Sequence, residues 1–147
     1  MKNLVSCCCS LHKLCIFGYL YREGGITLTD SRTLAYINLY AVLGTLENLC
    51  ELDSKAKELI SGLKKPVSIC FDVKGGPCAT IKFTSKGCRM EDGRRQHDIL
   101  IPFASCDKFN GMIDGTVTPI PVKGFTKIGF LLKTFVALTD RLTELMR

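Results

Sequence analysis

Tryptophan is absent from this 147-residue chain, and histidine occurs only twice. No hydrophobic run reaches the ~18 apolar residues that a bilayer-spanning helix requires, because Lys, Arg, Asp or Glu interrupts every run first. The sequence also has no basic stripe interspersed with aromatic residues, the pattern expected of many nucleic-acid-binding surfaces. These absences argue against a membrane-spanning protein and against a nucleic-acid partner.

Motifs for catalysis are also missing. The two histidines, His12 and His97, stand outside any recognisable motif. His97 precedes Asp98, but adjacent residues of a strand point to opposite faces, so these two side chains are not expected to cooperate as base and orienting acid. Gly75-Gly76 lacks the Lys-Ser/Thr of a phosphate-binding loop. We therefore predict a protein that is not an enzyme and that has no metal or other cofactor.

Cysteine, in contrast, is abundant, with nine residues in the chain. No two of them have the C-x-x-C spacing of zinc ligands or redox dithiols, and the contiguous Cys7, Cys8 and Cys9 cannot all face one ion. We expect free thiols in a reducing compartment and therefore a cytoplasmic protein. Cys106 begins a predicted helix, where a thiol can become reactive, although a small buried side chain is the simpler interpretation.

The N-terminal segment, residues 1–25, contains no clear helix or strand pattern. Leu4-Val5-Ser6-Cys7 resembles a lipoprotein cleavage box, but six preceding residues are too few for an apolar signal region. Palmitoylation of the Cys7 to Cys9 cluster would need a second membrane signal. We predict that 26–147 form a single domain, with helices over 30–63 and a sheet with further helices over 66–147.

The formal net charge of +6 is spread along the chain rather than concentrated in one block. Such a surplus favours solubility and attracts anionic lipid surfaces weakly, by roughly 1 kcal/mol per basic residue near the surface. A transient contact with a membrane surface therefore stays open as a hypothesis.

Hydrophobic periodicity predicts two helices at the start of the domain. After a cap at Asp30 or Ser31, apolar residues recur at helical spacing to residue 52. A shorter amphipathic helix follows over 53–63 and starts from Asp53 or Ser54. From Val67 the period changes to two, which predicts strands over 67–74, 79–84, 88–90 and 97–103. The Gly75-Gly76-Pro77 turn between the first two predicts an antiparallel hairpin. Four short strands in succession favour a meander, and Pro102 favours an edge position for the last of them.

The C-terminal third predicts a short helix, a strand and a long helix. Ser105 is expected to cap the short helix, which Gly115 ends. VKGFTKIGF, residues 122–130, is expected to form a fifth, irregular strand, and an amphipathic helix over 130–146 is expected to cover one face of the sheet. The order of elements predicts an α+β fold with a five-stranded, mostly antiparallel sheet.

From Val67 onward the chain resembles the sterol carrier protein-2 family in four segments: FDVKGGPCATIKF, KGCRMEDG, HDILIPFASCDKFNGMIDGTVTP and KGFTKIGF. The helical segment INLYAVLGTLENLCELDSKAKELI is similar to the N-terminal extension of small bacterial members. The resemblance implies a five-stranded antiparallel sheet that packs with helices around an apolar cavity for fatty acyl chains, acyl-CoA esters or sterols. It therefore implies non-catalytic binding, and with it carriage, of a hydrophobic ligand.

Aromatic, methionine and aliphatic side chains of the C-terminal half are the candidates for contact with such a ligand, because they offer large and adaptable apolar surfaces. The candidate ligand-binding residues are Phe103, Phe109, Met112, Ile113, Phe125, Phe130, Leu131 and Phe135. The alternative is that these residues fill a solid core. In that case the domain is a closed interaction or dimerisation module, for example a homodimer, without a lipid ligand.

Overall fold

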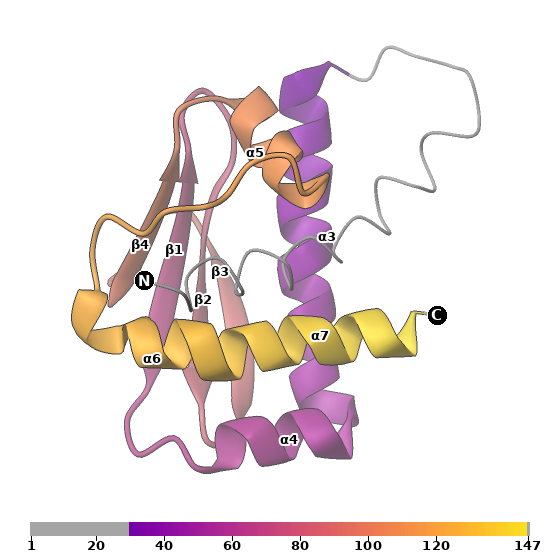
Figure 1. Cartoon of the computed structure of the whole chain (residues 1–147), viewed down its shortest axis with the longest axis vertical. Coiled ribbons are helices and arrows are strands. Elements are labelled where there is room, and N and C mark those ends of the chain that lie inside the picture. The colour runs from indigo at the N-terminus through magenta and orange to yellow at the C-terminus, as the bar shows by residue number, and fades with distance from the viewer. Residues whose placement is uncertain (1–29, 147) are drawn as a thin grey trace.

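The computed structural model describes residues 30–146 and shows an α+β fold in which helices cover one face of a four-stranded sheet (Figure 1). In chain order the elements are α3 (Ser31–Leu52), α4 (Ser54–Ser61), β1 (Val67–Val73), β2 (Cys78–Thr84), β3 (Gly87–Asp92), β4 (Ile99–Phe103), α5 (Cys106–Ile113), the 3-10 helix η2 (Phe125–Lys127), α6 (Ile128–Phe130), the π-helix η3 (Leu131–Phe135) and α7 (Val136–Leu145). No helix within 30–146 is long and apolar enough to cross a membrane. The expectations for the lipoprotein box, His12 and the Cys7 to Cys9 cluster lie outside the described residues.

The two leading helices begin where the sequence predicts caps. The side chain of Asp30 accepts a hydrogen bond from the Thr33 N–H, and that of Asp53 accepts one from the Ala56 N–H, so each satisfies a free amide of a first helical turn. The apolar stripe of α3 is buried against the sheet and the other helices: Ala35, Leu39, Val42, Leu43, Leu46, Leu49 and Cys50.

The sheet has the strand order β3-β2-β1-β4. The β1–β2 and β2–β3 pairs are antiparallel, as the alternating pattern and the Gly75-Gly76-Pro77 turn predict. The meander prediction is wrong for β4, which pairs parallel to β1 at the edge of the sheet. Pro102 lies in this edge strand, which is where a residue without an N–H is tolerated.

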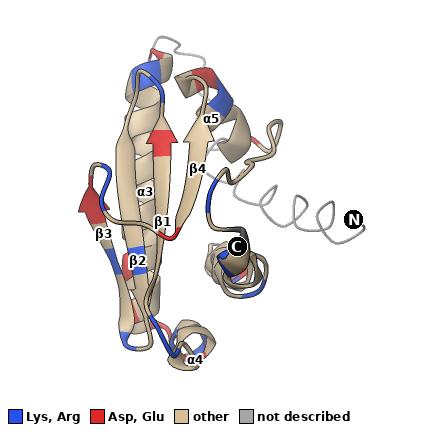
Figure 2. Cartoon of the chain, turned by 90° about the vertical axis from the view of Figure 1, so that its left-hand side faces the viewer, with Lys and Arg blue, Asp and Glu red and all other residues tan. Residues whose placement is uncertain are grey.

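The connection between β3 and β4 explains the parallel pairing. Residues 93–98 cross the open face of the sheet, as Figure 2 shows, and return the chain to the start of β1. Thr80 holds this crossover, since its hydroxyl donates to the Gly93 carbonyl and accepts from the Arg95 N–H. Asp98 then pairs with Ser68 through its N–H and its carboxylate. These contacts join residues far apart in the sequence, so local periodicity could not reveal them.

The predicted fifth strand over 122–130 is not formed. Only an isolated bridge between Lys123 and Leu100 extends the sheet beyond β4. Gly124 then adopts a φ of 96°, and a Cβ at this position would lie 2.4 Å from the Asp98 carbonyl oxygen. This turn directs the chain away from the sheet edge and into η2 and α6. Pro119 and Pro121 precede the bridge and have no N–H to donate to a ladder.

The predicted C-terminal helix is present as the continuous run α6–η3–α7, which crosses the helical side of the molecule in front of the sheet (Figure 1). Phe135 anchors it to the sheet, with ring centroids 6.2 Å from Phe71 and 6.0 Å from Phe83. Leu138 and Leu142 are buried as the stripe predicts, whereas Leu145 is exposed.

Candidate apolar binding cavity

A small cavity lies between α3, the sheet, α5 and the α6–α7 run, and its volume is about 70 Å³. All of its lining side chains are apolar except that of Thr118. The lining residues are Leu39, Val42, Leu43, Phe71, Ile101, Phe109, Met112, Ile113, Thr118, Pro119, Pro121, Ile128, Leu131, Leu132, Phe135 and Val136. An apolar cavity of roughly 150 Å³ accommodates benzene. The space as it stands is therefore smaller than an acyl chain, and a ligand of that kind requires part of the wall to move outward.

The wall contributed by α5 is fixed to α3 by hydrogen bonds of the buried Asn110 side chain. Asn110 donates to the Ser31 carbonyl over 2.9 Å and accepts from the Asn38 side chain over 3.1 Å. The Ser31 hydroxyl also donates to Asp107. Both polar atoms of the buried Asn110 amide have hydrogen-bond partners, so its burial does not leave an unsatisfied polar group that would cost stability. The hydrogen bonds instead fix how α5 is oriented on α3. This contact places the apolar side of α5, with Phe109 and Met112, against the cavity.

The opposite wall contains the π-helix η3. The Val136 N–H donates to the Leu131 carbonyl, five residues earlier, so this turn holds one residue more than an α-helical turn. Leu131 and Phe135, and likewise Leu132 and Val136, are four residues apart on one side of this helical run, and all four line the same space. Short π-helical turns occur frequently at functional sites.

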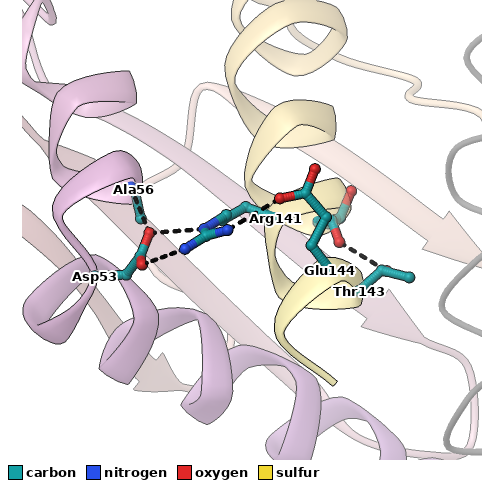
Figure 3. Close-up of polar contacts among 6 residues, drawn as sticks. Asp53, Ala56, Arg141, Thr143 and Glu144 are labelled. Atoms are coloured by element: carbon teal, nitrogen blue, oxygen red, sulfur yellow. Dashed lines mark hydrogen bonds and ion pairs between the residues drawn. The ribbon is translucent and has the colours of Figure 1, made fainter. Parts of the chain in front are cut away.

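A bidentate ion pair fixes the far end of α7, as Figure 3 shows. The Arg141 guanidinium donates to both carboxylate oxygens of Asp53, over 2.8 and 3.0 Å, and also to Glu144 over 3.0 Å. The hydrogen bond from Arg141, together with that from the Ala56 N–H, lowers the pKa of Asp53 to about 2. The same contacts raise the pKa of Arg141. Because Asp53 also caps α4, one carboxylate joins the start of α4 to α7.

The cavity brings together several of the residues predicted to contact a ligand. Those that line it are Phe109, Met112, Ile113, Leu131 and Phe135. Phe103 is buried behind them, with its ring 5.1 Å from that of Phe109. Phe130 lies outside the cavity and packs on Phe83 at 5.2 Å. The backbone of Phe125 lies in η2, and its side chain is outside the described part of the structure. Ligand contact by the lining residues stays a prediction.

Sequence reasoning missed the remaining lining residues for two reasons. Leu39, Val42 and Leu43 were recognisable as the apolar stripe of a helix, but a stripe does not show whether it meets a solid core or a space. Pro119 and Pro121 belong to a link without periodicity, so nothing local indicated that it closes a cavity. Their common signal was apolar composition, which by itself does not distinguish core from cavity wall.

Polar groups that sequence analysis considered for chemistry lie elsewhere and have structural partners. The His97 ring nitrogen Nδ1 lies 2.7 Å from the Arg95 carbonyl oxygen, and the Asp98 carboxylate accepts from the Ser68 N–H. Cys106 lies beside Gly76, where an added Cβ would approach its Sγ to 2.6 Å. Among residues 30–146, no group of three or more His, Cys, Asp or Glu residues is arranged to hold a metal ion.

The described cysteines are free thiols: Cys50, Cys70, Cys78, Cys88 and Cys106. Cys70 and Cys78 lie on neighbouring strands with their Sγ atoms 3.9 Å apart. Burial, together with the neighbouring Cys70, raises the pKa of Cys78 to about 12, so this group is a protonated thiol at neutral pH rather than a nucleophilic thiolate. Neither residue belongs to the cavity wall.

Comparison with known proteins gives no assignment: no protein-family model matches the chain, and no curated protein matches it. The resemblance to the sterol carrier protein-2 family stays a prediction. The four-stranded mixed sheet agrees with the α+β expectation but not with the expected fifth strand.

Proposed function

We propose that this domain binds a hydrophobic small molecule in the cavity beneath the α6–α7 run, without catalysing a reaction. The ligand class is a fatty acid, an acyl-CoA ester or a sterol-like lipid, as the resemblance to the sterol carrier protein-2 family implies, and binding extends to carriage of that ligand. The observation that supports the proposal most directly is a partly open pocket between the sheet and the helices whose walls are almost purely apolar. Ligand sites are typically concave and lined by apolar and aromatic side chains.

The link between α5 and η2 offers a wall that can move without disrupting the sheet. It is anchored at one end, where the Thr116 and Val117 N–H groups donate to the Gly111 carbonyl, and at the other by the bridge to Leu100. Between these anchors lie Pro119 and Pro121, which line the cavity and have no N–H. Outward movement of this stretch would enlarge the space and expose its apolar walls to an incoming chain. Apolar surface removed from water then contributes ~25 cal/mol per Å².

The alternative proposal is a closed module that associates with a second copy or with another protein. Its specific support is the small volume of the space, about 70 Å³. The two proposals differ in whether the purified domain takes up an apolar ligand.

Native mass spectrometry of freshly purified full-length protein, followed by solvent extraction, tests the proposal directly. We expect a stoichiometric adduct whose extracted mass is that of a fatty acid, an acyl ester or a sterol-like lipid, or else saturable uptake of an added fluorescent fatty acid. A ligand-free mass combined with no uptake of added fatty acid would contradict the proposal and support the closed module.

A matched pair of substitutions on the C-terminal helix locates the site. Leu132 lines the cavity, so Leu132→Asp places a charge in the cavity wall. Because the Leu132 side chain is partly exposed, we expect the variant to fold. Leu145 lies on the same helix, is 53% exposed and does not line the cavity, so Leu145→Asp is the control. We expect at least a tenfold weaker affinity for fatty acid in the first variant only. Equal affinities in both folded variants would place the ligand elsewhere.

A further inference from the structure

Two exposed aliphatic side chains stand beside the link that closes the cavity. Ile120 is 69% exposed and Val122 is 56% exposed. They alternate with Pro119 and Pro121, which line the cavity from the same stretch of chain. The cavity wall and an apolar outer surface are therefore two sides of one short segment.

The charged residues within this segment and the helical turns that follow it have one sign. Residues 115–139 contain Lys123, Lys127 and Lys133 and no aspartate or glutamate. Lys123 and Lys133 are exposed, and Lys127 is partly exposed. The Lys123 ammonium donates to the neutral His97 carbonyl over 3.3 Å, and among residues 30–146 it takes part in no ion pair. The link and the α6–α7 run that carry these lysines lie on the same side of the molecule (Figure 1).

Three other exposed aliphatic side chains have acidic neighbours instead, whereas Ile37, which is 43% exposed, has no charged residue next to it. Leu52, which is 79% exposed, lies between Glu51 and Asp53. Leu59 follows Glu58, and Leu145 follows Glu144, on two further exposed positions. Of the exposed aliphatic positions, only Ile120 and Val122 lie in a stretch whose charged residues are all basic, so an anionic surface would favour them over the three with acidic neighbours.

We propose that the mouth surface, defined as Ile120, Val122, Lys123, Lys127 and Lys133, docks on an anionic phospholipid bilayer. The aliphatic pair enters the headgroup region while the lysines meet lipid phosphates, which is how amphipathic surfaces bind membranes reversibly. Docking here would bring the movable wall of the cavity against the bilayer, so that an apolar ligand passes between them without crossing water. The inference rests on the proposed ligand-binding function, because the surface acquires this role from the cavity behind it.

Co-sedimentation of the full chain with vesicles tests the inference. We expect binding to vesicles of equimolar phosphatidylcholine and phosphatidylglycerol, much weaker binding to phosphatidylcholine alone, and loss of binding to the anionic vesicles at high salt, since surface charges are then screened. Equal binding to both compositions, or no binding to the anionic vesicles, would overturn the inference.

A pair of aspartate variants tests the aliphatic part of the surface. Ile120→Asp should weaken binding to the anionic vesicles about tenfold or more, because an exposed apolar side chain that enters the interface is replaced by a charge. Leu52→Asp changes a side chain of comparable exposure elsewhere and should leave vesicle binding within about twofold. Equal losses in the two variants would overturn the assignment of the surface.

A pair of charge reversals tests the lysines. The double variant Lys127→Glu, Lys133→Glu should weaken vesicle binding about 25-fold or more, at roughly fivefold for each lysine held near the membrane. The double variant Lys64→Glu, Lys65→Glu makes the same change in net charge at exposed positions outside the mouth surface. An equal loss in both double variants would show that net charge alone governs binding and would overturn the inference.

Uptake of a fluorescent fatty acid without vesicles separates this inference from the function on which it rests. Ile120→Asp should retain that uptake, because Ile120 does not line the cavity. Wild-type protein that takes up fatty acid in solution but ignores anionic vesicles would overturn the docking surface and leave the proposed function standing. Protein that binds vesicles but takes up no fatty acid would overturn the proposed function, and with it the transfer role of the surface.

Discussion

Substitution of Phe135 provides a sensitive test of whether the space beneath the C-terminal helix is empty. The ring is 4% exposed, packs near Phe71 and Phe83, and has part of its surface on the cavity. Phe83, by comparison, is fully buried, packs on Phe130 and Phe135, and does not line the cavity. The two phenylalanines therefore differ in how much packed surface an alanine would remove.

The structure fixes the expected magnitudes. A buried Phe→Ala substitution costs about 3–5 kcal/mol, and the cost rises by about 24 cal/mol for each Å³ of cavity created. Because part of the Phe135 side chain faces the existing space, an alanine at this position removes fewer packed contacts than an alanine at Phe83, so its cost should lie nearer the lower end of this range. We expect Phe83→Ala to lower the free energy of unfolding by about 5 kcal/mol and Phe135→Ala to lower it by about 3.5 kcal/mol.

Urea unfolding of the ligand-free proteins, followed by far-UV circular dichroism, measures the difference. With a denaturant slope of about 1.5 kcal/mol/M, the midpoints should fall by about 3 M and about 2 M, respectively. If Phe83→Ala does not fold, the leucine variants at the same two positions give a smaller effect in the same order. Equal losses at the two positions would refute the reasoning, because they would mean that Phe135 is packed on every side and that the space is filled.

Further substitutions test the elements that shape the site. Gly124→Ala should destabilise the fold by about 2 kcal/mol or more, because φ is 96° and a Cβ would approach a backbone oxygen to 2.4 Å. Gly129→Ala, in a helix with free space around it, should stabilise the fold by up to about 1 kcal/mol. Thermal unfolding of both variants compares the two effects. Asn110→Ala should cost about 1–3 kcal/mol in urea unfolding, because it leaves partly buried polar groups of α3 without this partner; an unchanged midpoint would contradict that role. Since the pKa of Asp53 is lowered from 3.8 to about 2, its pair with Arg141 should contribute stability above pH ~4 that is lost as the pH falls towards 2. Asp53→Asn should lack this part of the acid dependence in pH-dependent unfolding, and an unchanged pH profile would contradict the assignment.

The sequence by itself determined most of the local structure. Caps at Asp30, Asp53 and Ser105, helical spacing, and the change to a period of two at Val67 located the helices and the strands β1 to β4, because these signals depend on neighbours within a few residues. The α+β class follows from the order of those elements. Pro102 likewise indicated the edge position of β4.

Only the tertiary structure decided how these elements meet. The parallel pairing of β4 depends on contacts of the crossover with Thr80 and Ser68, and the end of the expected fifth strand depends on the approach of Gly124 to the Asp98 carbonyl. The cavity wall was decided in the same way, since Phe109 faces the space while Phe103 packs behind it. Apolar character is a property of each residue, whereas an unfilled volume exists only between residues that folding brings together from distant parts of the chain.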